Sequence, residues 1–305
     1  DPVTFDEGTL DDPERHEDVY VQTLVPASDV LFVVDNSCSM ANEQAQLAEN
    51  FTAFLETILQ SETDFHVGVV STDMTDPLHA GRLQEGLGFR WIDPDTPRPE
   101  IAYEDMVSLG VSGDPEERGR DAAFTAIELL GDDWNAGFVR EAASLHVMVV
   151  SDEDDASDIV GFDEFVAYLR GLKVAPFETT FSSVVGPVGS TMGPFSSCSA
   201  VHGEQYVALT AEVGGIDFSI CKRDWGPVLA ELGGRASGLR TAFYLTQRPL
   251  PTSIEVIIEV DGEPVPFETA NSGFLYDEVR NQVRIVNYLP PDGAVIRVRY
   301  VLGRS

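Results

Sequence analysis

One stretch constrains the fold more than any other: the apolar run Val30 to Val34, which stops abruptly at Asp35. An unbroken run of β-branched and aromatic residues is typical of a strand buried on both faces of a parallel sheet. Ser37 and Ser39 follow Asp35 at alternate positions, and a helix is predicted to start directly afterwards. Open α/β sheets bind ligands at the carboxyl ends of their strands, and hard divalent cations prefer oxygen ligands. The stretch therefore predicts an oxygen-rich cation site at the end of a strand.

A second apolar run, Leu145 to Val150, ends in Ser151-Asp152-Glu153-Asp154-Asp155. Together with Asp35-x-Ser37-x-Ser39, this resembles the metal-ion-dependent adhesion site of the von Willebrand factor type A domain, the fold shared with integrin inserted domains. The amino-acid sequence around both loops is similar to that of bacterial surface proteins of this family. The resemblance rests on two strand ends with matching chemistry, which occur in the order that the family has.

The resemblance implies a doubly wound, mostly parallel α/β sheet with helices on both faces. It also implies that Mg²⁺, or Mn²⁺ or Ca²⁺ in its place, is held at the two strand ends. In the family a carboxylate from a partner protein completes the coordination of this cation. The implied ligands are Asp35, Ser37, Ser39 and Asp152, with Asp152 acting through a water molecule.

The second metal loop departs from the family, because no threonine stands before the helix predicted at residues 118–130. Ser112 or Asp114 is expected to offer an oxygen in its place. An additional carboxylate there would make the site more negative, so that the cation is held more tightly with less need for an acidic partner ligand. Glu116 and Glu117 are interpreted as charges that favour the start of the helix.

Strand and helix patterns alternate between residues 29 and about 235, which favours the doubly wound sheet. The stretch 75–102 is rich in proline, glycine and charge and is expected to form a hairpin or an edge excursion around 89–92. Further strands are predicted at 66–70, 146–150, 177–185 and 216–220, and helices at 43–58, 118–130, 162–172, 204–213 and 225–232.

The pattern changes after residue 238, where strand-like segments and turns replace helical periodicity. Three regions are therefore predicted: an acidic extended lead-in at 1–26, a von Willebrand A-like domain at 27–238, and a small antiparallel β-sandwich at 239–305. The strands of the sandwich are expected at 240–245, 253–260, 281–286 and 294–302. The last region is short for a seven-stranded sandwich, so it either packs on the first domain or borrows a strand from elsewhere.

Charge and length exclude several classes of function. With 19 basic and 52 acidic residues the formal net charge is −33, so nucleic acid and anionic membranes would be repelled. No apolar run approaches the roughly 20 residues of a membrane span. The acidic surface fits a salt-adapted or extracellular protein, or alternatively a specific acidic partner surface.

The chain has three cysteines. Cys198 and Cys221 bracket a loop and the strand after it, and a disulfide is expected between them if the protein is exported. Cys38 would then stay unpaired in the metal loop, where the family usually has glycine.

Other polar groups near the strand ends have two readings each. Thr72 and Asp73 follow a predicted strand and either support the metal site or form an ordinary turn. The acidic run from Glu153 to Asp158 either binds a second cation or is a solvated turn. The sequence has neither the nucleophile elbow nor the phosphate loop, and its histidines show no metal-ligand spacing. No enzymatic activity is predicted.

The predicted function is divalent-metal-dependent adhesion or protein binding by an exported protein, bacterial by resemblance, at the cell surface or in the extracellular space. The partner is either a protein that offers a carboxylate or another copy of the chain. The alternative is a self-assembling structural subunit of an extracellular filament or surface layer, because heterologous contacts produce open polymers.

Overall fold

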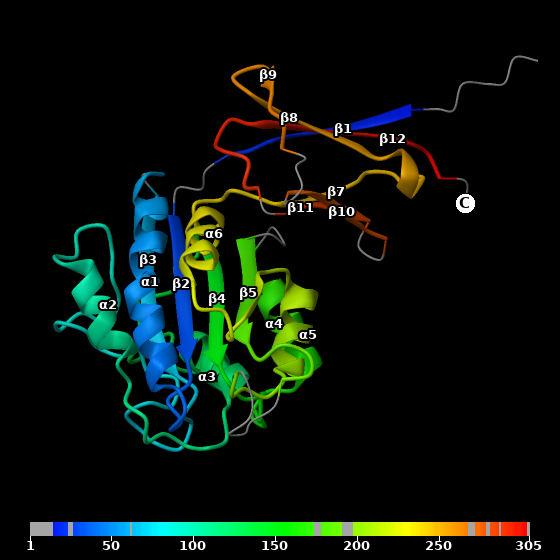
Figure 1. Ribbon diagram of the computed structural model, residues 1–305. Helices are drawn as coiled ribbons and strands as arrows, with labels where there is room; N and C mark the ends of the chain where they lie inside the picture. The colour runs from blue at the N-terminus through cyan, green and yellow to red at the C-terminus, as the bar shows by residue number, and fades with distance from the viewer. Residues whose placement is uncertain are drawn as a thin grey trace, which may run out of the picture. The chain divides into compact units, whose positions relative to one another are not determined.

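The computed structural model describes residues 15–23, 27–61, 63–173, 178–190, 198–267, 272–278, 281–286 and 288–303. The chain forms two compact units (Figure 1). The larger unit is Leu24–Gly238, and the smaller unit combines Asp1–Thr23 with Leu239–Ser305.

The larger unit is built on a parallel sheet with the strand order β3-β2-β4-β5-β6. The first strand of this sheet along the chain, β2, lies between the second and the third. This is the 2-1-3-4-5 order of doubly wound folds, whose ligands bind where the order reverses, here between β2 and β4. The strands are β2 (Ala27–Val34), β3 (Asp64–Ser71), β4 (Ser144–Ser151), β5 (Thr179–Val185) and β6 (Asp217–Ser219).

Helices cover both faces of this sheet, which explains why β2 is apolar without alternation. Val30, Phe32 and Val34 pack in one core with α1 (Ala41–Leu59), α2 (Pro99–Val107) and α6 (Gly226–Ala236). Leu31 and Val33 pack in a second core with α3 (Gly119–Phe124), α4 (Phe162–Gly171) and α5 (Glu204–Val213). Figure 1 shows α1 and α6 on the near side of β2 and β4. The predicted doubly wound α/β fold is confirmed.

Two local predictions in the larger unit differ from the structure. Helix α2 begins at Pro99, inside the stretch 75–102 that was expected to form a hairpin or an edge excursion, and continues to Val107. The sequence did not predict this helix because Pro99 follows a polar, proline-rich segment. Residues 89–92 contribute only a tight turn between Gly86 and Phe89 and a single bridge from Ile92 to Val67 at the sheet edge. The helix predicted at 118–130 is α3 followed by a π-helical turn, Thr125–Leu129.

The predicted disulfide joins Cys198 to Cys221, whose Cα atoms are 5.4 Å apart. Cys38 is exposed and unpaired. Among the described helices, none combines the length and the apolar character that a membrane crossing needs.

The smaller unit is a sandwich of two antiparallel sheets. One sheet has the order β1-β12-β8-β9 and the other β10-β11-β7. Residues of both sheets, among them Phe243, Val283, Ile258 and Val298, share one hydrophobic core. The strands are β1 (Arg15–Val21), β7 (Ala242–Tyr244), β8 (Glu255–Val260), β9 (Glu263–Pro264), β10 (Gly273–Asp277), β11 (Gln282–Val286) and β12 (Val295–Val301).

The prediction of an extended lead-in is wrong for residues 15–21, which form β1 and pair with β12 along its whole length. The most buried side chain of β1 is a carboxylate: Asp18 is 6% exposed and accepts hydrogen bonds from the Thr246 hydroxyl at 2.6 Å and the Tyr300 hydroxyl at 2.7 Å. Val19 and Val21 point outward instead. An inward carboxylate and outward valines are the opposite of the pattern that usually identifies a strand. For this reason the sequence did not predict β1, which is the additional strand of the sandwich. Residues 1–14 and 24–26 of the predicted lead-in lie outside the described residues.

Candidate metal centre

The carboxyl ends of β2 and β4 meet because these strands are parallel neighbours in register, with Val34 opposite Val150. Asp35 directly follows β2, and its amide donates to the Val150 carbonyl at 3.0 Å. Ser151 closes β4, and its hydroxyl donates to Asp35 Oδ2 at 2.7 Å. The reversal of strand order thus brings the two predicted loops into direct contact.

The polar groups of the first loop are hydrogen-bonded to one another and to Asp152. Asp35 is fully buried, and its Oδ1 accepts the Ser37 amide at 2.7 Å. The Ser37 and Ser39 hydroxyl oxygens lie 3.1 Å apart, and the Ser39 hydroxyl donates to Asp152 Oδ1 at 3.2 Å. The four predicted ligands therefore form one continuous hydrogen-bonded group. Helix α1 begins immediately after it, at Ala41.

Ser112 and Asp114 lie in a loop that touches the first one, because the Gly113 amide between them donates to the Asn36 carbonyl at 2.9 Å. Ser112 is exposed. Asp114 Oδ1 accepts the Glu116 amide of its own loop at 3.0 Å, and the Asp114 amide donates to Asp73 Oδ2 at 3.3 Å. Neither residue has a hydrogen bond to the four predicted ligands among the described contacts.

The second loop instead contributes Glu117, which the sequence pattern assigned to the start of a helix. Glu117 is 1% exposed, and the nearby charge of Asp35 helps to raise the pKa of its carboxyl. The Thr72 hydroxyl donates to Glu117 Oε2. The sequence alone carried no signal that would separate Glu117 from the neighbouring Glu116.

Burial and mutual repulsion raise the pKa values of this group. Burial raises the pKa of Glu117 to about 9, and the nearby charge of Asp35 adds to the rise. The same two causes raise the pKa of Asp152 to about 7. Burial also raises the pKa of Asp35 and of the half-buried Glu43. These carboxyls are close together and withdrawn from water, which disfavours their ionised forms.

The donor set fits a divalent cation. Among the described residues, no lysine, arginine or histidine pairs with Asp35, Glu117 or Asp152, although buried carboxylates normally need a counter-charge. Glu117 Oε1 is buried and has no hydrogen-bond partner. Carboxylate and hydroxyl oxygens are the donors that Mg²⁺ and Ca²⁺ prefer. In the described part of the chain, no group of three His, Cys, Asp or Glu side chains is placed to hold a metal ion.

The acidic run after Asp152 has structural partners. Asp155 forms an ion pair with Arg120 at 2.9 Å, and Asp154 Oδ1 accepts the Gln205 amide at the start of α5 at 3.0 Å. Asp158 lies 3.4 Å from Arg118. These contacts fix the loop against its surroundings and favour the reading as a structural turn over a second cation site.

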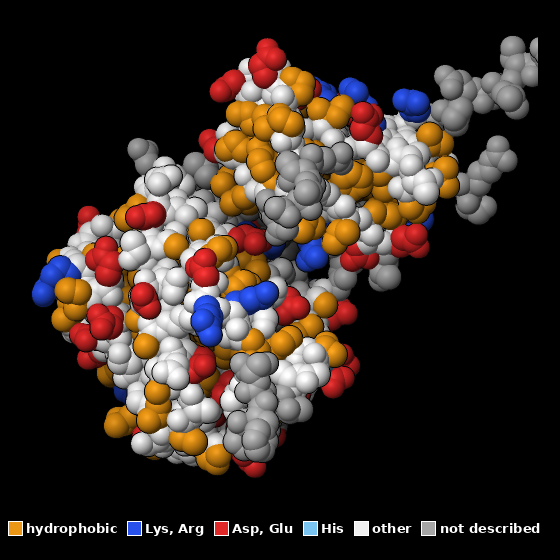
Figure 2. Space-filling model, viewed as in Figure 1, with side chains coloured by type: hydrophobic (Ala, Val, Ile, Leu, Met, Phe, Trp, Pro, Cys, Tyr) orange, Lys and Arg blue, Asp and Glu red, His pale blue; other side chains and the backbone are white. Residues whose placement is uncertain are grey.

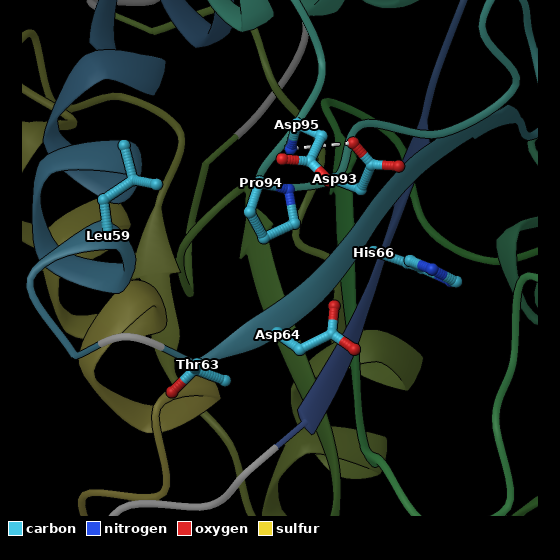
Figure 3. A pocket seen from close by; sticks show the side chains of 7 residues that line it. All are labelled: Leu59, Thr63, Asp64, His66, Asp93, Pro94 and Asp95. Atoms are coloured by element: carbon cyan, nitrogen blue, oxygen red, sulfur yellow. Dashed lines mark hydrogen bonds between the residues drawn. The ribbon is translucent and has the colours of Figure 1, made fainter.

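Two hollows lie near the sheet. The pocket in Figure 3 has a volume of about 500 Å³ and lies beside the amino end of β3, whereas the metal-site loops follow the carboxyl ends of the strands. Asp64 there is paired with Arg140, and Asp93 accepts the Asp95 amide. A second hollow of about 480 Å³ is lined by Gln44 and Gly110. It adjoins the candidate metal centre, because Gln44 donates to the Asp35 carbonyl at 3.0 Å and to the Gly110 carbonyl at 2.9 Å.

Gly113 is expected to be required for the shape of the centre. A Cβ atom at Gly113 would lie 2.2 Å from Asn36 Oδ1, and Asn36 is buried and held by the Ser71 hydroxyl at 2.8 Å. Gly113→Ala should cost about 2 kcal/mol in the free energy of unfolding, as overpacking does. Urea unfolding measures this, with Gly171→Ala as the control, since a Cβ there meets nothing within 4 Å. Equal stabilities of the two variants would contradict the prediction.

Neither a known family model nor a curated protein matches the sequence. Among solved structures, the chain is similar to a von Willebrand factor type A protein from Catenulispora acidiphila, with 11% identity and a TM-score of 0.44, over 96% of this chain and 66% of that chain. It is also similar to the pilus adhesin SpaC from Lactobacillus rhamnosus GG, with 10% identity and a TM-score of 0.41, over 94% of this chain and 41% of that one.

The strand order and the two strand-end loops carry the assignment of the fold. Five parallel strands in the 2-1-3-4-5 order have helices on both faces, and Asp35-x-Ser37-x-Ser39 meets Asp152 where the order reverses. The larger unit of this chain has the doubly wound α/β fold that the resemblance to the von Willebrand factor type A domain implies, and the chain adds an antiparallel β module.

Proposed function

We propose that the protein binds a partner protein through a divalent cation held by Asp35, Ser37, Ser39 and Asp152. The observation that carries the proposal is the hydrogen-bonded group that these four residues form, in which Asp35, Ser37 and Asp152 are buried and no basic residue of the described chain balances the carboxylates. Mg²⁺ is the first candidate, with Mn²⁺ and Ca²⁺ as alternatives. When bound, the cation supplies a Lewis-acidic position that an oxygen of the partner can complete.

The surroundings of the centre suit recognition of a protein. The hollow beside Gln44 is open and is lined by Ala41, Ala45 and Ala48 of α1 and by Val111, which is 38% exposed. A partner that reaches the centre can bury apolar surface there. On the face seen in Figure 2, acidic side chains are scattered among other residues and basic ones are few. Together with the net charge of −33, this disfavours acidic polymers as partners.

Adhesion at the cell surface or in the extracellular space is the setting we propose. The disulfide between Cys198 and Cys221 supports it, since disulfides persist in oxidising compartments. No catalytic step is part of the proposal.

Calorimetric titration of metal-stripped protein with Mg²⁺, Mn²⁺ and Ca²⁺ tests the proposal. Saturable binding is expected for the native chain. The double variant Ser37→Ala with Ser39→Ala should bind at least about tenfold more weakly, because outer contacts alone already contribute tenfold or more to metal affinity. The matched control is Ser190→Ala with Ser253→Ala, whose hydroxyls donate to the backbone carbonyls of Pro187 and Leu250.

Absence of saturable binding to the native chain would refute metal-dependent recognition. It would also favour the alternative of a self-assembling structural subunit. Molar mass measured over a range of protein concentrations would then be the next experiment, because a subunit of a polymer grows in mass with concentration and a monomer does not.

A further inference from the structure

Two arginines beside β3, the edge strand of the parallel sheet, share one tryptophan ring. The Arg82 guanidinium carbon lies 3.9 Å from the centre of the Trp134 ring, and that of Arg90 lies 5.4 Å from the same centre. Arg90 also lies 5.7 Å from the centre of the Trp91 ring and donates a hydrogen bond to the Trp134 carbonyl. All four side chains are half-buried. We call them the arginine-tryptophan cluster.

Backbone hydrogen bonds attach both arginine-bearing segments to β3. Gln84 follows Arg82 closely in the chain, and its amide donates to the Val69 carbonyl at 2.9 Å. Ile92 follows the other arginine and exchanges two backbone hydrogen bonds with Val67, each of 2.8 Å. The guanidinium groups are therefore held on segments that need no rearrangement to meet a ligand, which lowers the cost of binding.

The acid-rich chain leaves both arginines of the cluster without a carboxylate. With 52 acidic and 19 basic residues in the sequence, a basic side chain readily finds an acidic neighbour. Even at the surface, Arg170 pairs with Glu212 at 2.8 Å. Within the described ranges, neither Arg82 nor Arg90 forms an ion pair. Two positive charges beside one ring repel each other, and an anion placed between them would relieve that repulsion.

The chemistry of the guanidinium group indicates which anion fits. A guanidinium that contacts a ring through its face keeps the N–H groups of its edge for another partner. In the part of the chain that the structure describes, the Arg82 guanidinium has no hydrogen bond, so its edge is available. A planar carboxylate accepts two parallel hydrogen bonds from such an edge.

We infer that the arginine-tryptophan cluster binds a carboxylate side chain from an acidic peptide segment of a partner protein. The inference goes beyond the proposed function, because the cluster lies beside β3, whereas the metal centre follows β2 and β4, and needs no cation. An acidic sugar is a poorer ligand, since Arg82 already contacts the Trp134 face on which a sugar ring would stack. The net charge of −33 repels long polyanions, but at physiological salt charges beyond about 8 Å are largely screened from a single carboxylate.

Equilibrium dialysis against an acetylated, amidated diglutamate tests the site. EDTA is present throughout, so the metal centre takes no part, and the matching diglutamine peptide is the uncharged control. The native chain should bind the diglutamate saturably and the diglutamine not at all. Arg82→Gln and Arg90→Gln should each weaken binding by about tenfold, as loss of a hydrogen bond to a charged group does.

Three further variants and measurements make the result specific. Arg223→Gln removes the same charge from an exposed position of the same unit and should bind like the native chain. Arg82→Lys keeps the charge but lacks the planar edge, and should lose most of the binding that Arg82→Gln loses. Thermal unfolding checks that each variant is folded. Arg82→Gln decides the matter if Arg90→Gln unfolds, because only Arg90 donates a hydrogen bond to the Trp134 carbonyl.

Absence of saturable binding to the native chain, or equal binding by Arg82→Gln, would overturn the inference. Full binding by Arg82→Lys would overturn recognition through the planar edge. Saturable binding of glucuronate in place of diglutamate would overturn the peptide as the ligand class. None of these results bears on the proposed cation, since EDTA is present in every sample.

Discussion

Arg140→Ala is expected to destabilise the larger unit by about 3–5 kcal/mol, because it removes the guanidinium that pairs directly with a buried carboxylate. Asp29 on β2 is fully buried. Its carboxylate accepts the Arg140 amide at 2.6 Å and Nε at 2.8 Å, and lies 2.7 Å from Nη2. Arg140 also pairs with Asp64 on β3, so one guanidinium ties two neighbouring strands together. In the variant, only the backbone amide of residue 140 still donates a hydrogen bond to Asp29.

Urea unfolding followed by tryptophan fluorescence measures this loss. All three tryptophans, Trp91, Trp134 and Trp225, lie in the larger unit, so the signal reports on that unit alone. Arg170→Ala is the matched control, since Arg170 and Glu212 form a pair at 2.8 Å with side chains 50% and 46% exposed. Exposed pairs contribute at most about 1 kcal/mol. A loss below 1 kcal/mol in Arg140→Ala would mean that water reaches Asp29.

In EDTA, the melting temperature of the protein is expected to fall as the pH rises from 5 to 9. Glu117 and Asp152 have pKa values raised to about 9 and about 7 in the folded state. The folded protein therefore binds more protons than the unfolded chain over this range, and its stability decreases as these protons are lost. The decrease should extend to about pH 9, where Glu117 finishes ionising.

Mg²⁺ is expected to reverse this fall, and by more at pH 8 than at pH 5, because the ligands bind the cation in their ionised forms. At a concentration of about 100 times the dissociation constant, the gain is about 2.7 kcal/mol. Asp152→Asn is the comparison variant: it lacks the group with a pKa of about 7 and should show a shallower fall around neutral pH. A melting temperature in EDTA that is constant or rises between pH 5 and 9 would contradict the prediction.

The family of folds and the main strand ends were predictable from local patterns. Val30 to Val34 is apolar without alternation because helices cover both faces of β2, and burial of that kind is encoded in consecutive residues. Asp35 and Asp152 could be placed near each other because parallel strands end at the same edge of a sheet. The disulfide between Cys198 and Cys221 was likewise predictable from the cysteine positions.

Two features were decided only by the tertiary structure. The sequence shows two adjacent glutamates, and only the packing of the loop before α3 buries Glu117 against Asp35 while Glu116 stays in water. Strand β1 pairs with β12, from Arg15 opposite Val301 to Val21 opposite Val295. The centre of its buried face is the carboxylate of Asp18, which accepts hydrogen bonds from Thr246 and Tyr300.

The physical reason is the range of the interactions. Apolar periodicity and strand-ending residues act within a few positions of the chain, so the sequence by itself determined the doubly wound sheet and the oxygen-rich ends of β2 and β4. Burial of a polar side chain is stable only when partners distant in sequence satisfy it. Asp18 and Glu117 therefore acquired their places only when the whole chain had folded around them.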